Sequence, residues 1–309
     1  MIYTPNKLNP LHFALSFGNI EASQLLFDQF WEQKSDNNFT SLHAALLGDL
    51  HKIVDIIHEK SGKQQEIITK FGNSALIFAA QSNSSYLNNY ISTITLQNLQ
   101  GATALHISVK NGHFQQILLK EARIQDNNGF SALHYAAQIN NEMAICNLVD
   151  KEGDLVNKKG DTALVIACKY QQPYNLLLNQ TMIKNNLGQF ALLIAIQNKF
   201  PITALLEEKS LRGRLQETPL MVAAQCANEQ AVNMLISEQK KQRDINGCAA
   251  SMYALQNGHY TIFKQIFKEE ADLSLCFRCS SICLELKCEQ TILDLINRTR
   301  RKLEQQLLE

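Results

Sequence analysis

The segment Ser131-Ala132-Leu133-His134-Tyr135-Ala136-Ala137 is one copy of a phrase that recurs along the chain. Its anchoring leucine has counterparts at positions 11, 42, 76, 105, 164, 192 and 220, and Ser251 holds a ninth position, so neighbouring copies are 28 to 34 residues apart. A period in this range is typical of stacked helical repeats, in which each unit buries its apolar face against its neighbours. The sequence therefore predicts an all-helical solenoid whose role is binding.

Each copy of the phrase has the features of a helix start. A residue with a small hydroxyl or amide side chain, suited to accept an unpaired backbone N–H at a helix N-cap, stands at Asn9, Thr40, Ser74, Thr103, Ser131, Thr162 and Thr218. Breaks such as Asn111-Gly112-His113 follow, and then a second apolar period such as Ile262, Phe263, Ile266 and Phe267. We predict that each unit is a helix, a tight turn and a second helix.

A turn precedes most copies. Glycine stands four residues before the anchoring position at Gly72, Gly101, Gly129, Gly160, Gly188 and Gly247, within polar strings such as Gln125-Asp126-Asn127-Asn128. Glycine at a fixed place in a polar segment indicates a reversing turn that needs a positive φ. The sequence therefore predicts a projecting loop before each first helix.

These features together resemble the ankyrin-repeat family: a turn with Gly, the phrase T-P-L-H-x-A-A, then N-G-H, then an amphipathic second helix. The resemblance covers roughly residues 5 to 270. It implies an all-α ankyrin-repeat solenoid of helix-turn-helix units with short projecting hairpin loops. We expect an array of about nine repeats over residues 1–272. Residues 273–309 are expected to form a cysteine-containing degenerate capping unit and a C-terminal amphipathic helix.

Some copies depart from the family pattern. Lys7, Asn38 and Gln216 replace the turn glycine, Phe190 and Ala249 replace the capping residue, and Ser251 replaces the leucine. Those units are expected to be looser. Because the period also runs short of the family's usual ~33 residues, we expect abbreviated loops and smaller hairpins.

The composition excludes several function classes. The chain has 29 basic and 29 acidic residues, so it carries no net positive charge that would attract it to nucleic acid or anionic lipid. Residues 1–7 do not show the charged flank followed by a long apolar stretch that is typical of a signal peptide, and no apolar run is long enough to span a membrane. We expect a cytoplasmic monomer that binds neither nucleic acid nor membrane and needs no cofactor.

The repeated histidines His12, His43, His106 and His134 stand near hydroxyl residues, as a nucleophile's base would. A catalytic site would occur once, whereas this histidine recurs. The family resemblance implies instead that it forms hydrogen bonds between neighbouring turns. No phosphate-binding loop, zinc-protease motif, kinase motif or nucleophile elbow is found. The sequence therefore predicts a protein that is not an enzyme.

One cluster lies outside the repeat pattern. Cys276, Cys279, Cys283 and Cys288 crowd a short segment, and four thiolates are a possible zinc ligand set. Structural zinc sites usually join two distant pairs, so the spacing favours small apolar residues in a degenerate tenth unit. No metal site is predicted, and a metal- or redox-responsive regulator is the alternative function.

The last segment, residues 289–309, lacks Pro and Gly and is predicted to be one helix. Its apolar stripe is Ile292, Leu295, Ile296, Leu303 and Leu307. This stripe either caps the last repeat or pairs with a partner. The basic cluster Arg298, Arg300, Arg301 and Lys302 suits a solvated helix face better than a nucleic-acid site.

The predicted function is a non-enzymatic adaptor or scaffold that binds a partner protein on the concave hairpin and inner-helix surface. By resemblance, the partner-facing positions flank the turn glycine and end the first helix. They are Lys70, Phe71, Asn73, Lys110, Asn127, Asn128, Phe130, Lys158, Lys159, Asp161, Lys169, Tyr170, Asn186, Leu187, Gln197, Arg214, Glu217 and Asn246. Exposed aromatic and cationic residues of this kind are enriched in binding hot spots.

Overall fold

The first helix of each repeat begins at the predicted cap. In the computed structural model, which describes residues 8–60 and 62–307, the Asn9 side chain accepts the backbone N–H of His12 at 2.8 Å. Thr162 caps in the same way by accepting the N–H of Val165 at 3.2 Å. Phe190 and Ala249 occupy cap positions without a side-chain hydrogen bond. The described residues form helices and no strands, which confirms the predicted all-α class.

The chain divides into two compact units at Lys158 and Lys159. Unit 1 contains α1 (Pro10–Ser16), α2 (Ile20–Phe30), α3 (Ser41–Leu47), α4 (His51–Lys60), η1 (Gly62–Glu66), α5 (Ala75–Gln81), η2 (Ser85–Thr93), α6 (Ala104–Lys110), η3 (Gln116–Glu121), α7 (Ala132–Ile139) and α8 (Glu142–Glu152). Unit 2 contains α9 (Ala163–Lys169), η4 (Asn175–Gln180), α10 (Ala191–Gln197), η5 (Thr203–Ser210), α11 (Pro219–Gln225), α12 (Glu229–Gln239), α13 (Ala250–Gln256), α14 (Tyr260–Glu270), α15 (Leu273–Leu286) and α16 (Gln290–Gln306).

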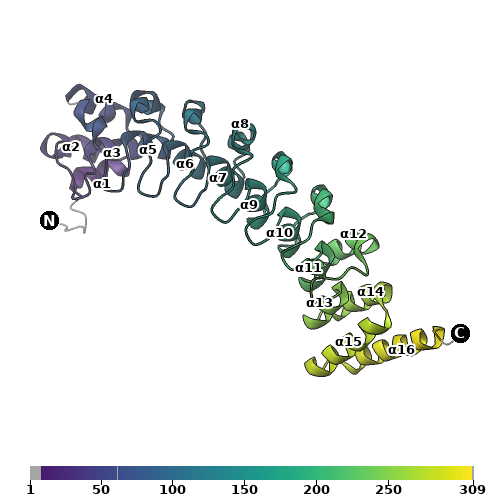
Figure 1. Ribbon diagram of the computed structural model, residues 1–309. Helices are drawn as coiled ribbons and strands as arrows, with labels where there is room; N and C mark the ends of the chain where they lie inside the picture. Colours follow the sequence, from purple (N-terminus) through teal and green to yellow (C-terminus); the bar gives the residue numbers. More distant parts are fainter. Residues whose placement is uncertain (1–7, 61, 308–309) are drawn as a thin grey trace. The chain divides into compact units, whose positions relative to one another are not determined.

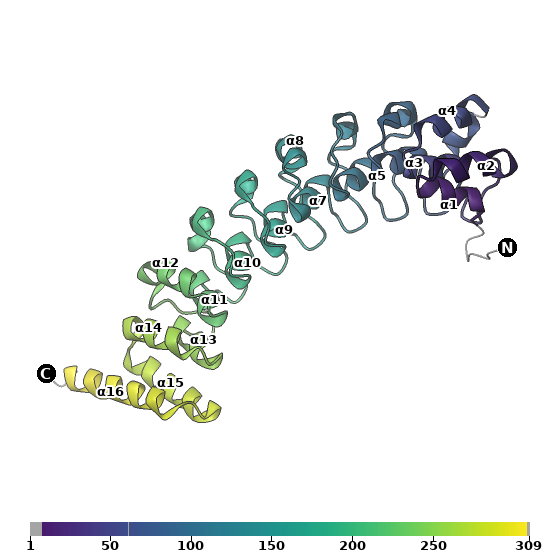
Figure 2. The same ribbon diagram turned by 180° about the vertical axis from the view of Figure 1, so that it is seen from behind.

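Within each unit the first helices of successive repeats lie side by side. In unit 1 these are α1, α3, α5, α6 and α7, and in unit 2 they are α9, α10, α11 and α13. The second elements form another row, and the hairpin loops project from the edge of the first row (Figures 1 and 2). The core lies between the rows, because nearly every residue of a first helix is buried, as in Leu192, Leu193 and Ile194.

The short repeat period is explained by the second element and not by the loops. In four repeats the second element is a 3-10 helix (η2, η3, η4 and η5), where we predicted an ordinary helix. The connecting loops keep their length: residues 122–131 join η3 to α7, and residues 240–249 join α12 to α13. The expectation of abbreviated hairpins was therefore wrong, because the residues are lost from the second helix.

The spacing of buried residues shows why the two kinds of second element differ. Leu118 and Glu121 are buried in η3, and Leu205 and Glu208 are buried in η5, three residues apart in each case. A 3-10 helix places residues i and i+3 on the same face. In α12 the corresponding buried pair is Leu235 and Gln239, four residues apart, which suits the α-helical period.

A buried Glu or Gln ends most second elements and bonds to the first helix of its own repeat. The side chain of Glu208 accepts the N–H of Leu192, 16 residues earlier, at 2.7 Å. Gln239, in a longer repeat, accepts the N–H of Leu220, 19 residues earlier, at 2.8 Å. An N–H near the start of a helix has no partner within the helix, so the buried side chain supplies one. Sequence analysis did not predict this contact.

The buried Glu or Gln makes a second hydrogen bond, which joins neighbouring repeats. A Glu accepts this bond, whereas Gln239 donates it. The Glu208 carboxylate accepts the N–H of Met182 at 2.8 Å, and Met182 has a φ of 68°. Glu121 accepts the N–H of Thr95, whose φ is 74°, in the same way. The Gln239 amide instead donates to the carbonyl oxygen of Lys209 at 2.7 Å. In these three repeats a carboxylate therefore stands where the preceding loop presents a donor, and a carboxamide stands where it presents an acceptor.

Ser251, which replaces the anchoring leucine, is fully buried and has its own partner. Its hydroxyl and its N–H both donate to one carboxylate oxygen of Glu270, at 2.7 and 3.0 Å. The polar residue therefore replaces apolar packing with hydrogen bonds to the Glu at the end of its own repeat. Whether this unit is looser stays a prediction.

The predicted C-terminal helix is α16, which packs against α15, and α15 packs against α13. Ile292 and Ile296 are buried, whereas Leu307 is 74% exposed. Within the basic cluster, the Arg300 guanidinium lies 5.3 Å from the Phe277 ring centroid on α15. Both ends of the chain lie outside the described residues. They are residues 1–7, which begin the predicted array and include Lys7, and residues 308–309, which end the predicted capping segment.

Candidate functional site

Most hairpins are held by a polar side chain at their start. One carboxylate oxygen of Asp126 accepts the backbone N–H groups of Asn128 and Phe130, at 2.8 and 2.9 Å. Gly129 then takes a φ of 77°, and a Cβ at that position would lie 2.7 Å from the backbone nitrogen of Lys158. The predicted positive φ is confirmed at all six turn glycines. Glycine is therefore required at Gly129 both by φ and by the approach of the next hairpin.

Backbone hydrogen bonds connect successive hairpin tips. In unit 1 the N–H of Leu99 donates to the carbonyl oxygen of Phe71 at 2.9 Å. In unit 2 the N–H of Asn186 donates to Lys159, and that of Ile245 donates to Leu215, both at 3.0 Å. These bonds join the tips in a continuous row in unit 1 and in two pairs in unit 2. The tip side chains then project from a rigid support, which lowers the entropy lost on binding.

The hairpin that begins at Gly213 has a different construction. Gly213 has no side chain, and the Glu217 carboxylate accepts the N–H of Leu215 at 2.7 Å. A Cβ on Gly213 would lie 2.1 Å from an oxygen of Glu217. The carboxylate therefore takes the place that a side chain fills at the start of the other hairpins.

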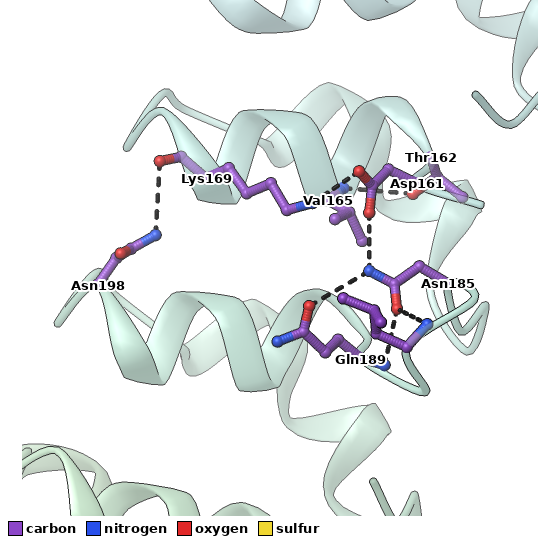
Figure 3. A network of polar contacts seen from close by, with 8 residues as sticks. Asp161, Thr162, Val165, Lys169, Asn185, Gln189 and Asn198 are labelled. Carbon is purple, nitrogen blue, oxygen red and sulfur yellow. Dashed lines mark hydrogen bonds and ion pairs between the residues drawn. The ribbon is translucent and has the colours of Figure 1, made fainter. Parts of the chain in front are cut away.

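A polar network lies beside the hairpins of unit 2, at α9 and α10 (Figure 3). The Lys169 ammonium reaches back along α9 to Asp161, 2.6 Å away, and the Asn185 amide donates to the other Asp161 oxygen at 2.8 Å. Asn185 also accepts the N–H groups of Leu187 and Gln189, at 3.0 and 2.9 Å. The network links a first helix to the next hairpin.

An apolar cavity of about 390 Å³ opens in unit 1 beside the hairpins. Phe13 of α1 and Phe17 directly after that helix, together with Phe39, Phe71 and Phe78, line it. Phe17 is 83% exposed and Phe71 is 50% exposed. A cavity of this size with aromatic walls suits an apolar side chain or a small apolar group.

Most of the predicted surface residues are exposed in their unit. In unit 1 the exposed ones are Lys70, Phe71, Lys110, Asn127, Asn128 and Lys158, and Asn73 and Phe130 are half-buried. In unit 2 the exposed ones are Lys159, Tyr170, Asn186, Leu187, Gln197, Arg214 and Asn246, and Lys169 and Glu217 are half-buried. Asp161 is buried, with both carboxylate oxygens bonded within the network.

Some of these residues are brought together and others stand apart. Phe71 and Asn73 line the same cavity. Phe130 packs against the Tyr135 ring, with centroids 5.3 Å apart, and the Lys110 ammonium lies 5.5 Å from the same ring. Lys169 and Asp161 form an ion pair. Gln197 lies at the end of α10, away from the hairpin tips.

The repeated histidines connect neighbouring repeats. Nδ1 of His43 accepts the N–H of Thr40 at 3.2 Å, and Nε2 lies 3.1 Å from the carbonyl oxygen of Ile67. His106 has the same partners in its own repeat, Thr103 and Phe130. Burial lowers the pKa of His43 to about 4, so the ring is neutral at pH 7. The expected role in hydrogen bonding between turns is confirmed for these two residues.

The cysteine cluster lies mainly in the core. Cys276, Cys279 and Cys283 are buried on α15, and Cys288 is half-buried after its end. Burial raises the pKa of Cys283 to about 12, which favours the thiol over the thiolate. Among residues 8–60 and 62–307, no group of three or more His, Cys, Asp or Glu side chains is arranged to hold a metal ion.

Sequence reasoning missed the residues that support the surface. No role was predicted for Asn185 and Gln189 in the network, or for Phe13, Phe17 and Phe39 as cavity walls. One signal was available for the hairpins: Asn98, Asp126, Asn157, Asn185 and Asp244 each stand three residues before a turn glycine. A short polar side chain at that position favours a turn that it can cap.

Comparison with known families identifies the architecture. Residues 76–158 and 202–275, about half of the chain, match the family model described as ankyrin repeats (3 copies). The chain therefore belongs to the ankyrin-repeat family. Proteins of this family generally mediate protein–protein interaction and are typically non-enzymatic. A search among curated proteins finds no match. No helix within the described ranges is both long enough and apolar enough to cross a membrane.

Proposed function

We propose that this protein is a non-enzymatic adaptor or scaffold that binds a partner protein through its hairpin tips and the exposed ends of its first helices. The observation that carries the proposal is the set of hairpin tips, which backbone hydrogen bonds join along unit 1 and in two pairs in unit 2, and which bear dissimilar exposed side chains. Rigid support with varied side chains is the arrangement by which repeat proteins achieve specific recognition.

The proposed surface keeps the exposed members of the predicted set and omits Asp161, which acts within the polar network. The aromatic cavity of unit 1 provides a place for an apolar anchor of the partner, and such anchors dominate binding energy. We assign residues 1–272 to the binding array and residues 273–309 to its capping unit, in a cytoplasmic monomer. The packing of α16 on α15 supports the assignment of a cap.

Affinity capture with two matched variants tests this function. The tip variant carries Phe71→Ser, Tyr170→Ser and Leu187→Ser, at side chains 50%, 51% and 57% exposed. The control variant carries Leu25→Ser, Met143→Ser and Leu176→Ser, which remove comparable exposed apolar groups from second elements. We expect the tip variant to lose at least about 90% of the captured partner, because hot-spot truncations cost about 2 kcal/mol or more. The control variant should retain it.

The capture experiment would contradict the proposal if the control variant lost the partner and the tip variant retained it. Both variants change only exposed side chains, so their thermal unfolding should match that of the unmodified protein.

A further inference from the structure

Three neighbouring hairpins of unit 2 each present an exposed aliphatic side chain. Leu187 is 57% exposed, Leu215 is 51% exposed and Ile245 is 68% exposed. These hairpins precede α10, α11 and α13, which pack side by side in that order. We call Leu187, Leu215 and Ile245 the aliphatic tips. Aliphatic groups with this exposure in consecutive repeats form an apolar line that water solvates poorly.

Cations accompany the aliphatic tips. Lys184, Arg212 and Arg243 each stand directly before the turn of one of these hairpins, and Arg214 is exposed at the second turn. Arg243 pairs with Asp272, 2.8 Å away, whereas Lys184 and Arg214 are exposed. In unit 1 the equivalent positions before Asn98 and Asp126 hold neutral Gln97 and Gln125. The combination of aliphatic and cationic groups therefore distinguishes these three hairpins.

The carboxylates of the same hairpins, one buried and one half-buried, accept hydrogen bonds from their own loops. Asp244 is buried, and its oxygens accept the N–H of Asn246 at 2.9 Å and the hydroxyl of Tyr253 at 2.7 Å. The Glu217 carboxylate accepts the N–H of Leu215. These groups satisfy backbone and side-chain donors of their own loops. The surface around the aliphatic tips consequently attracts anions.

The spacing of the tips selects the conformation of the ligand. Helices packed side by side are about 8–10 Å apart, so Leu187 and Leu215, which hold the same place in their hairpins, are separated by about that distance. Ile245 stands one place earlier in its hairpin, and its N–H donates to the Leu215 carbonyl oxygen at 3.0 Å, so it lies beside Leu215. A polyproline II segment has three residues per turn and rises about 3.1 Å per residue, so its side chains return to one face about every 9 Å. Two residues three apart in such a segment therefore meet Leu187 at one position and the adjacent Leu215 and Ile245 at the other.

We propose that the aliphatic tips and their cations bind an extended acidic segment of a partner protein, with an aliphatic side chain at every third position and carboxylates between them. The aliphatic groups of the segment pack against Leu187, Leu215 and Ile245. Its carboxylates pair with Lys184, Arg212 and Arg214. The inference rests on the proposed function and names the partner chemistry for unit 2.

A defined peptide tests the assignment. The probe is a fluorescein-labelled peptide of three Leu-Asp-Glu triplets, and its affinity is measured by fluorescence anisotropy with the full-length protein. A Ser-Asp-Glu peptide keeps the charge without the aliphatic groups, and a Leu-Asn-Gln peptide keeps the aliphatic groups without the charge. We expect both controls to bind at least about tenfold more weakly. Raising the salt concentration should also weaken binding of the probe, because charge pairing at a surface is screened.

Single variants locate the site. Leu215→Ser and Arg214→Glu should each weaken binding of the probe at least about fivefold. Leu176→Ser, which removes a side chain 46% exposed on the second element η4 of the same unit, should change it less than about twofold. Circular dichroism melting checks that each variant folds.

Several results would overturn the assignment: no binding of the probe up to about 1 mM, equal binding of either control peptide, or an equal loss with Leu176→Ser. If the probe does not bind, but capture of the partner still requires the hairpin tips, then the proposal of an acidic segment is wrong and the proposed function stands. If capture is independent of the tips, the proposed function itself fails.

Discussion

Replacing Gln239 by Glu is expected to destabilise the protein by about 3 to 4 kcal/mol at pH 7 and by little near pH 4. Gln239 is 4% exposed, accepts the N–H of Leu220 and donates to the carbonyl oxygen of Lys209. A protonated Glu has one donor and one acceptor and reproduces both bonds. An ionised Glu would place an oxygen against the Lys209 carbonyl, so burial and repulsion raise the pKa of the new side chain in the folded state.

The sign of the pH dependence follows from that raised pKa. The unfolded chain releases the proton near pH 4.3, whereas the folded chain retains it, so the folded state binds more protons above that pH. Stability is then lost by about 1.4 kcal/mol per pH unit as the pH rises from 4.3 towards the folded-state pKa. Urea unfolding of the variant and the unmodified protein at pH 4.5, 5.5 and 7 measures the difference.

Gln230→Glu is the matched control for this substitution. Gln230 is exposed on the same helix, α12, so the same chemical change should alter stability by less than about 0.5 kcal/mol at each pH. An equal loss at pH 4.5 and pH 7, or no loss at all with Gln239→Glu, would contradict the role assigned to the buried amide.

Leu133→Ala is expected to destabilise the protein by about 2 to 5 kcal/mol, because it removes a fully buried side chain and leaves a cavity. Leu133 lies on α7, which packs against α6 and α8. Since a repeat is coupled mainly to its neighbours, amide exchange should accelerate first in α7 and α8 of the same repeat and in α6 of the preceding one. Ile139→Ala, at a side chain 40% exposed on the same helix, should cost less than half as much. An unchanged unfolding curve for Leu133→Ala would contradict the predicted repeat core.

Sequence patterns predicted the features that are local and repeated. The caps at Asn9 and Thr162 and the turn at Gly129 follow from single residue types with strong conformational preferences. The 3-10 second elements were not predicted, because their short apolar runs satisfy more than one helical period. The distinction was present in the sequence as a buried Leu followed by Glu or Gln three residues later in η3 and η5, and four residues later in α12.

The sequence predicted which residues lie on the candidate site better than it predicted the contacts that they make. Residues beside the turn glycines, such as Phe71 and Leu187, follow from the repeat pattern and are exposed. The burial of Asp161 was not predictable, because it depends on Lys169 at the far end of α9 and on Asn185 in the next hairpin. The convergence of phenylalanines on one cavity likewise requires the packing of three successive repeats.

The most direct test of the central claim is covalent labelling of lysine amines with and without the captured partner, read by mass spectrometry. Lys70, Lys110 and Lys159 lie on the proposed surface, and Lys52, Lys151 and Lys264 are exposed on the second helices α4, α8 and α14. If the partner binds the hairpin tips and first-helix ends, it should slow labelling of the first set at least about fivefold and leave the second set unchanged. Protection of Lys52, Lys151 and Lys264, with Lys70, Lys110 and Lys159 still labelled at their original rates, would contradict the account.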